Sequence, residues 1–168
     1  MKISTEECVS SIPSDLGLLV PNQKTDCILL AGDKEWKVHK SVLKKHSSIL
    51  ISNTHNPQRV ILHDMNSEVA EELLRFLYTN SVLHLDIHCK TLLRISDYYE
   101  IKTLKMYCEQ YLINCITPVN VSEMLLLSDI FECPLLKKAA LNYCRVYYSY
   151  IIKVRYNPLH YLNRIWFI

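Results

Sequence analysis

The chain has 168 residues, of which 49% are apolar and 21% are charged, and its formal net charge is +2. These values predict one compact domain with an extension and exclude a disordered chain. No apolar run reaches the roughly 18 residues of a membrane span, and the acidic, non-apolar start MKISTEECVSS does not resemble a signal peptide.

Cysteine usage and charge distribution give two further expectations. The seven cysteines are scattered and form no C-x-x-C motif, so we expect reduced thiols that pack as small apolar side chains in the cytosol or nucleus. No acidic residue follows Glu132, so the last 36 residues carry a charge of +6 and the first 132 carry −4. This asymmetry indicates an acidic partner, a nucleic-acid contact, or a tail that is not a normal part of the domain.

The first half of the chain predicts a small sheet. Residues 1–13 read as a flexible lead-in, and a short apolar helix with Leu16 and Leu19 follows. Residues 25–48 predict a strand, a turn in which Gly32 takes a positive φ, a second strand and a helix. Alternation of apolar residues predicts a third strand over 59–63.

The remainder predicts helices. Apolar residues recur with helical spacing around residues 69–77, 92–99 and 104–115, and Pro118 is expected to end the third of these helices. Asn120 with Glu123 predicts a capping box at the start of a fourth helix, and Pro134 suits the first turn of a fifth. A small sheet followed by packed helices is the α+β class.

Three groups of residues could carry other chemistry. The group His84, Asp86, His88 and Cys89 is the best metal-like cluster, but it lacks a second ligand pair at zinc-site spacing, so we expect no metal and no cofactor. His39 has no nucleophile or carboxylate at a telling spacing, and a hydrogen-bonded role at a strand-to-helix junction is expected instead of catalysis. The basic run is interrupted by acidic residues and has one aromatic residue within it, which favours a solvated helix face over nucleic-acid binding; its members are Lys34, Lys37, Lys40, Lys44, Lys45 and His46.

Residues 25–48 (TDCILLAGDKEWKVHKSVLKKHSS), FLYT at 76–79 and ISDYYEIKTLKMYCEQYL at 95–112 together resemble the BTB (POZ) domain. The resemblance is nearest to the BTB and 3-box part of speckle-type POZ (MATH-BTB) proteins, although no MATH-like sequence stands before it here. It implies a BTB/POZ fold over residues 14–116, a helical 3-box extension over 117–154 and an atypical tail over 155–168. It also implies a non-catalytic protein-interaction module in the nucleus, the cytoplasm or both.

The resemblance implies a dimer and a ligase partner. Members of this kind resemble dimeric adaptors of cullin-3 ubiquitin ligases. The dimer positions that carry over are Leu16, Leu19, Asp26, Lys40 and Val42, and the charged side chains of Asp26 and Lys40 are expected to face each other. The cullin-binding positions that carry over are Leu50, Tyr78, Asn120, Met124 and Leu125. The segment SILISNTHNPQRV is shorter than its counterpart in the family and lacks the glutamate of the hydrophobic-x-Glu motif, so weakened cullin-3 binding is expected.

Two functions therefore remain open at this point: a cullin-3 adaptor, and a stand-alone BTB protein that pairs with other BTB proteins and regulates them or transcription without binding cullin. The aromatic and basic C-terminus leaves two alternatives open: a segment that lies on a membrane surface or in a partner groove, and a truncated or non-native end, which explains the pattern at least as well. No nucleic acid and no membrane is expected as a partner.

Overall fold

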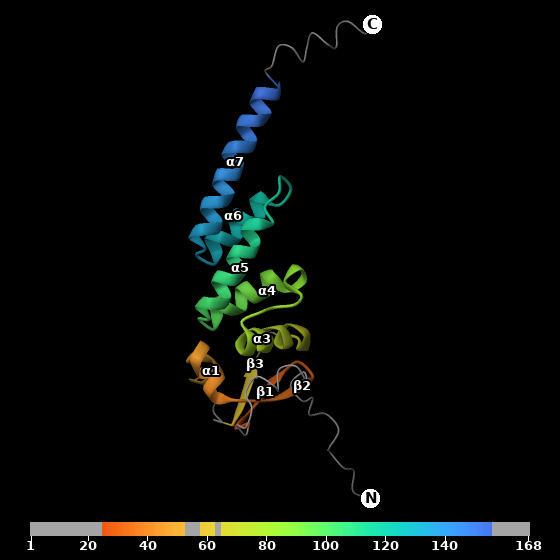
Figure 1. The fold of residues 1–168 in the computed structure, drawn as a ribbon, viewed down its shortest axis with the longest axis vertical. Helices are drawn as coiled ribbons and strands as arrows, with labels where there is room; N and C mark the ends of the chain where they lie inside the picture. Colours follow the sequence, from red (N-terminus) through yellow and green to blue (C-terminus); the bar gives the residue numbers. More distant parts are fainter. Residues whose placement is uncertain (1–24, 53–57, 63–64, 156–168) are drawn as a thin grey trace, which may run out of the picture. The chain divides into compact units, whose positions relative to one another are not determined.

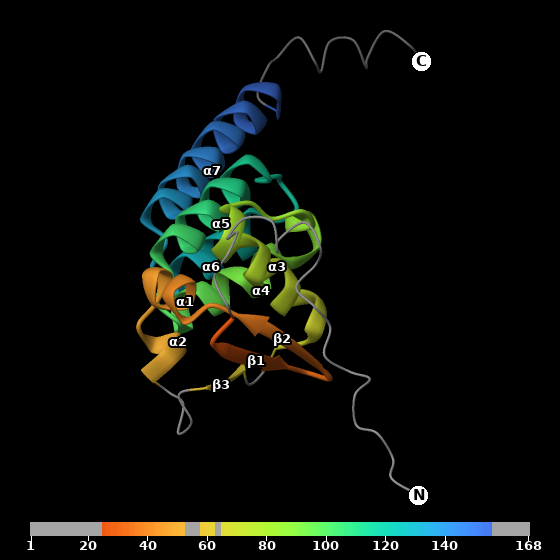
Figure 2. The same ribbon diagram turned by 60° about the horizontal axis from the view of Figure 1, so that its bottom comes forward.

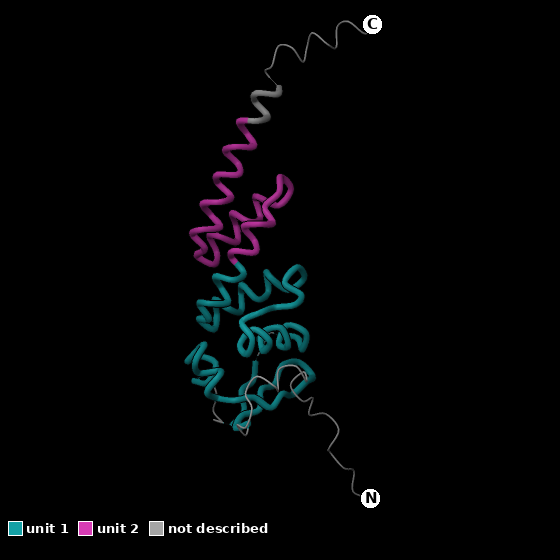
Figure 3. Tube along the Cα trace, viewed as in Figure 1, with its two compact units in different colours: residues 1–108 teal, residues 109–168 magenta. Residues whose placement is uncertain are grey.

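A computed structural model describes residues 25–52, 58–62 and 65–155, with side chains as far as Ser149. The chain divides into two compact units, residues 1–108 and 109–168 (Figure 3). The predicted lead-in, the predicted helix with Leu16 and Leu19, and the tail beyond Arg155 lie outside the described residues.

The first unit is built on a three-stranded sheet in the order β2-β1-β3 (Figures 1 and 2). Strand β1 (Cys27–Ala31) pairs antiparallel with β2 (Lys34–Val38), and it pairs parallel with β3 (Arg59–Leu62). The predicted alternation is confirmed, because the cross-strand pairs Cys27–Val38 and Leu29–Trp36 are buried.

The predicted turn at Gly32 is also confirmed. Gly32 and Asp33 form a two-residue connection between β1 and β2, and Gly32 has a φ of +59°. A Cβ at this position would lie 3.3 Å from the backbone nitrogen of Ser67. Both the left-handed conformation and this close approach therefore favour glycine.

Helices α1 (Lys40–His46) and α2 (Ile49–Ser52) follow the hairpin and lie beside each other next to the sheet (Figure 2). Helix α3 (Ser67–Thr79) is capped by Asn66, whose side chain accepts a hydrogen bond from the N–H of Val69 at 3.0 Å. Helix α4 (Leu85–Tyr98) follows, and α5 (Lys102–Asn114) begins in the first unit and ends in the second. The core of the first unit includes Trp36, Phe76, Leu43, Leu73, Leu92 and Ile101.

The second unit contains the end of α5, α6 (Val121–Ile130) and α7 (Pro134–Arg155). The predicted start of the last helix at Pro134 is confirmed. Helices α6 and α7 pack against each other, and each has buried residues, among them Met124 on α6 and Leu136 on α7. Leu135, which directly follows Pro134 in the first turn of α7, is exposed.

Helices α4 and α6 end in the same way. The N–H of Ile101 donates to the carbonyl of Ser96 at 2.8 Å, and the N–H of Cys133 donates to the carbonyl of Ser128 at 2.9 Å. The residues that precede these donors, Glu100 and Glu132, have φ values of +53° and +48°. Both ends are therefore Schellman motifs with a glutamate at the left-handed position.

The structure is the predicted α+β arrangement, a small sheet with helices around it and further helices at the C-terminal side. Among the described residues, no helix combines the length and apolar character needed to cross a membrane.

Candidate protein-interaction surfaces

His39 and Tyr78 join the sheet to α1 and α3. His39 follows β2 and precedes α1, and its side chain is buried. Its backbone N–H donates to the Tyr78 hydroxyl at 3.0 Å, and its Nδ1 lies 2.9 Å from the same oxygen. The prediction that His39 has a hydrogen-bonded role at a strand-to-helix junction is confirmed.

Burial sets the proton affinities around this junction. It raises the pKa of the Tyr78 hydroxyl above its ordinary value, and the hydrogen bond from the His39 backbone only partly offsets this effect. Burial also raises the pKa of the Cys27 thiol, against an opposing effect of the Lys40 charge. Both groups are therefore held in their neutral forms at neutral pH, which suits a structural junction rather than a nucleophile.

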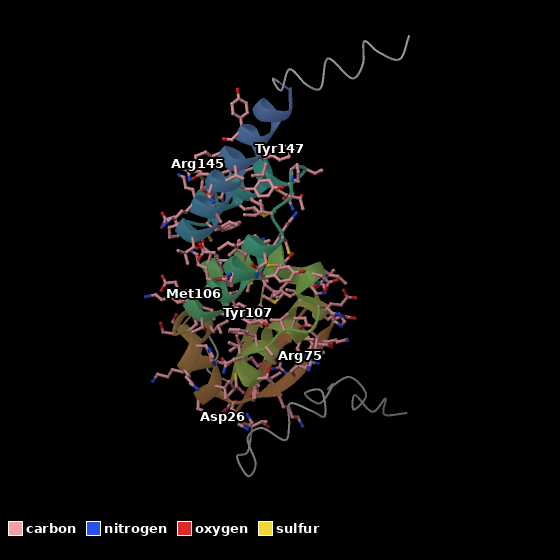
Figure 4. All side chains as sticks on the ribbon, turned by 45° about the horizontal axis from the view of Figure 1, so that its top comes forward. Asp26, Arg75, Met106, Tyr107, Arg145 and Tyr147 are labelled. Atoms are coloured by element: carbon pink, nitrogen blue, oxygen red, sulfur yellow. The ribbon has the colours of Figure 1, made fainter. Side chains whose placement is uncertain are left out.

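Asp26, which Figure 4 labels, forms a hydrogen bond with Lys40 at the edge of this junction. The Asp26 carboxylate accepts a hydrogen bond from the backbone N–H of Lys40 at 2.8 Å. The expected contact between these residues thus exists, but it is made by the backbone of Lys40, the first residue of α1. A carboxylate at this end of a helix also interacts favourably with the helix dipole. Asp26 is exposed and remains accessible to a partner.

Val42, the other described dimer position, is half-buried on α1. Leu16 and Leu19 lie outside the described residues. Asp26, Lys40 and Val42 therefore belong to one region around the start of α1, and their assignment to a dimer interface stays a prediction.

The positions expected to bind cullin in the first unit differ in exposure. Tyr78 is half-buried, and its hydroxyl is engaged by His39. Leu50 is buried in α2, where only 1% of its side chain is exposed. The Leu50 side chain thus contributes to the core in this structure and presents no surface to a partner.

The expected cullin-binding positions in the second unit also differ in exposure. Met124 is 2% exposed and belongs to the core, whereas Leu125 is half-buried. Asn120 stands at the N-cap of α6, but the expected capping box is wrong. Its Oδ1 accepts from the N–H of Thr117 at 2.7 Å and its Nδ2 donates to the carbonyl of Cys115 at 2.8 Å, so the side chain closes the preceding turn instead.

Two exposed apolar side chains near the end of α4 and the start of α5 were missed by the sequence reasoning. Tyr98 is 67% exposed and Met106, which Figure 4 labels, is 64% exposed. They follow Asp97 and Lys105 in sequence, and these two residues form an ion pair with an Nζ–Oδ1 distance of 2.6 Å. Helical spacing offered a signal for both, because Tyr98 is adjacent to the buried Tyr99 and Met106 is two residues from the buried Leu104, and such neighbours do not share a helix face.

A second exposed apolar group lies in the second unit. Its members are Val119, Leu126 and Ile130. Leu126 and Ile130 are four residues apart on α6 and therefore share one helix face. Exposed apolar side chains of this kind, bordered by polar residues, mark candidate contacts with other proteins.

The remaining candidate groups do not form sites. Within the residues that the structure describes, no cluster of three or more His, Cys, Asp or Glu side chains is placed to hold a metal ion. Cys89 is buried and its Sγ donates to the carbonyl of Cys108 at 3.6 Å. The basic run does not form a single helix face, since Lys34 and Lys37 lie on β2, and Lys34 pairs with Glu71 at 2.9 Å.

The described residues form an α+β fold in which polar side chains bind the protein's own backbone and several apolar side chains are exposed to solvent. Comparison with known families agrees with this description. The sequence model of one family, described as the BTB/POZ domain, matches residues 18–116, which is more than half of the chain.

Proposed function

Because the chain belongs to the BTB/POZ family, whose domains mediate protein–protein contacts and form homo- or heterodimers, we propose that it is a dimeric adaptor subunit of a cullin-3 ubiquitin ligase. We also propose that residues 14–116 form the dimerising domain, that residues 117–154 extend it as a 3-box, and that the protein acts in the nucleus, the cytoplasm or both.

The observation that carries the adaptor function is the pair of exposed side chains Tyr98 and Met106. Aromatic and methionine side chains are enriched where proteins bind one another, and a few such anchors supply most of the binding free energy. Asp97 and Lys105, which directly precede these two residues in sequence, form an ion pair, so charged groups accompany both apolar residues along the chain. A helical partner surface that covers Tyr98 and Met106 would remove both from water.

The segment between α2 and β3 supports weakened cullin-3 binding. Helix α2 ends at Ser52 and β3 begins at Arg59, and no glutamate occurs between them. The family motif that resembles this segment supplies one anchor of the cullin contact. Loss of a single anchor worth about 1.4 kcal/mol lowers affinity about tenfold.

The cullin test is calorimetry of the full chain with the N-terminal part of cullin-3. We expect measurable binding that Tyr98→Asp and, independently, Leu126→Asp each weaken at least tenfold. Met124→Asp is unsuitable because Met124 is buried. Ile87→Asp is the matched control, since Ile87 is exposed on α4 at its other end. Binding that is equal in all four proteins would overturn the assignment of the surface, and absence of binding would overturn the adaptor function.

The dimer test is light scattering at tens of micromolar. We expect a mass near twice that of the 19.7 kDa chain, and a monomer for the double variant Leu16→Asp, Leu19→Asp. A wild-type mass near that of one chain would contradict the proposed homodimer.

A second candidate is a stand-alone BTB protein that pairs with fuller BTB proteins and blocks them or regulates transcription. The short segment without glutamate between α2 and β3 favours it. Heterodimer formation on mixing with a MATH-BTB protein, combined with no cullin-3 binding in calorimetry, would select this candidate over the adaptor.

A further inference from the structure

A basic hollow lies in the first unit between the end of α1 and the start of α5. Its volume is about 350 Å³. The residues that line it and matter here are Lys44, Lys45, Ser48, Glu100, Lys102 and Thr103. We refer to it as the basic hollow.

The charge of the basic hollow is not balanced. Three lysines and one glutamate line it, and none of the three lysines forms an ion pair within the described residues. Lys34, Lys105 and Lys137, in contrast, each pair with a carboxylate at 2.9 Å or less. Like charges that share a small hollow repel one another, and a bound anion would relieve that repulsion.

Lys102, unlike Lys44 and Lys45, stands at a helix end where its charge is not stabilised by the helix dipole. Lys44 and Lys45 stand in the last turn of α1, where cations stabilise the helix dipole. Lys102 is the first residue of α5, where the dipole disfavours a cation, and the first turn of α5 contains no acidic residue. An anion beside Lys102 would interact favourably with both the lysine and the helix terminus.

Hydrogen-bond donors complete the basic hollow. The side chains of Ser48 and Thr103 are exposed. In the described part of the chain, the N–H of Thr103 has no backbone acceptor, because the first bond of this helix runs from the N–H of Lys105 to the carbonyl of Ile101. The basic hollow therefore offers ammonium, hydroxyl and amide donors from two helices and the turns beside them.

We propose that the basic hollow binds a phosphate monoester. A monoester presents a nearly dianionic head with three acceptor oxygens at neutral pH, which matches the excess of two positive charges and the several donors. The phosphate of a monoester stands at the end of a side chain or small molecule, so it fits a hollow whose volume is at the lower end of the range for ligand sites. A phosphodiester polymer would need a continuous basic surface, and Glu100 interrupts this one.

The test is ¹H–¹⁵N NMR titration of the full chain with O-phosphoserine, with unphosphorylated serine as the matched ligand. We expect saturable shifts of the Thr103 and Ser48 amides with phosphoserine and none with serine. Lys102→Gln should weaken binding roughly three- to tenfold, and Glu100→Gln should tighten it by a similar factor, since each changes one charge near the anion. Lys37→Gln, an exposed lysine on β2, should leave the affinity unchanged.

A second titration, with a phosphorylated seven-residue peptide, identifies the kind of molecule that carries the phosphate. At least tenfold tighter binding than phosphoserine identifies a phosphorylated protein segment, whereas equal binding identifies a small phosphate ester. Shifts that do not saturate, that do not respond to Lys102→Gln, or that are larger and tighter with a single-stranded oligonucleotide would overturn the proposal.

Discussion

Glu109 on α5 accepts a hydrogen bond from the backbone N–H of Leu135, 26 residues later, at 2.8 Å. The same oxygen accepts from the N–H of Leu136 at 2.9 Å. Glu109 is buried, and these N–H groups belong to the first turn of α7, which otherwise lacks an acidic residue. One carboxylate from α5 thus caps the N-terminus of α7 within the second unit, and its negative charge also interacts favourably with the helix dipole of α7.

We expect Glu109→Ala to destabilise the second unit by about 1.5–3 kcal/mol, since it leaves buried backbone donors without an acceptor. Glu109→Gln retains one acceptor oxygen and should cost less. Urea unfolding followed by circular dichroism gives the stability, and faster hydrogen exchange at the Leu135 and Leu136 amides localises the change. Gln110→Ala, at the exposed neighbouring position, is the control; a Glu109→Ala protein as stable as this control would contradict the capping role.

Tyr78→Phe should destabilise the first unit by about 1 kcal/mol or more, because it removes a hydroxyl that serves both the backbone and the ring of His39. Thermal or urea unfolding measures the loss. Tyr98→Phe removes a hydroxyl from an exposed tyrosine and should be nearly neutral. Equal effects of the two substitutions would show that the hydrogen bonds to His39 add nothing to stability.

His46 should make stability depend on pH. Its ring lies edge-on to Phe76 at 6.3 Å, and burial lowers its pKa below the ordinary value, with Lys45 acting in the same direction and a hydrogen bond to the Leu77 backbone opposing both. Glu100, Lys44 and Lys102 also line the hollow beside it. The folded state therefore binds a proton less readily than the unfolded chain does.

The contribution of His46 to stability is consequently complete above the unfolded pKa of about 6.5. It decreases as the pH falls through that value toward the lower folded pKa. We expect His46→Gln to lose less stability than wild type between neutral and mildly acidic pH, as measured by urea unfolding, and the ring protons of His46 to titrate below the ordinary value in NMR. A ring that titrates above it would reverse the sign and contradict the assigned burial effect.

Cys27 should react slowly with alkylating agents, because it is buried and its pKa is raised. Cys144 is more exposed and should react first. Mass spectrometry after limited treatment with iodoacetamide at neutral pH distinguishes the two. Preferential modification of Cys27 would indicate that the junction with Asp26 and Lys40 opens readily.

Local patterns predicted the fold well where one face of an element is buried. The burial of Leu29 and Trp36 was expected from strand alternation, and the positive φ of Gly32 was expected from the turn between the strands. Local sequence patterns predicted the interaction surfaces less well than the fold. Leu50 and Met124 carry over from the family by position, but sequence position does not reveal burial, which depends on the elements packed above them.

Contacts between distant residues account for the rest. The Glu109 cap and the link from the Ser47 hydroxyl to the Tyr99 carbonyl, 52 residues apart, depend on tertiary packing that no local window contains. Asn120 illustrates a further limit, since its position at the N-cap was predicted whereas its side chain satisfies the preceding turn. The exposed side chain of Tyr98 was not singled out from the sequence, because its role at the surface becomes visible only in the folded structure.

The two Schellman ends have a consequence for the conformational energy of the chain. A left-handed backbone costs a non-glycine residue about 1 kcal/mol, and glycine bears almost none of that cost. Glu100 and Glu132 therefore hold small amounts of strain at the ends of α4 and α6, in a chain with only two glycines. Glycine would relax the backbone at both positions, so we expect Glu100→Gly and Glu132→Gly to relieve this strain.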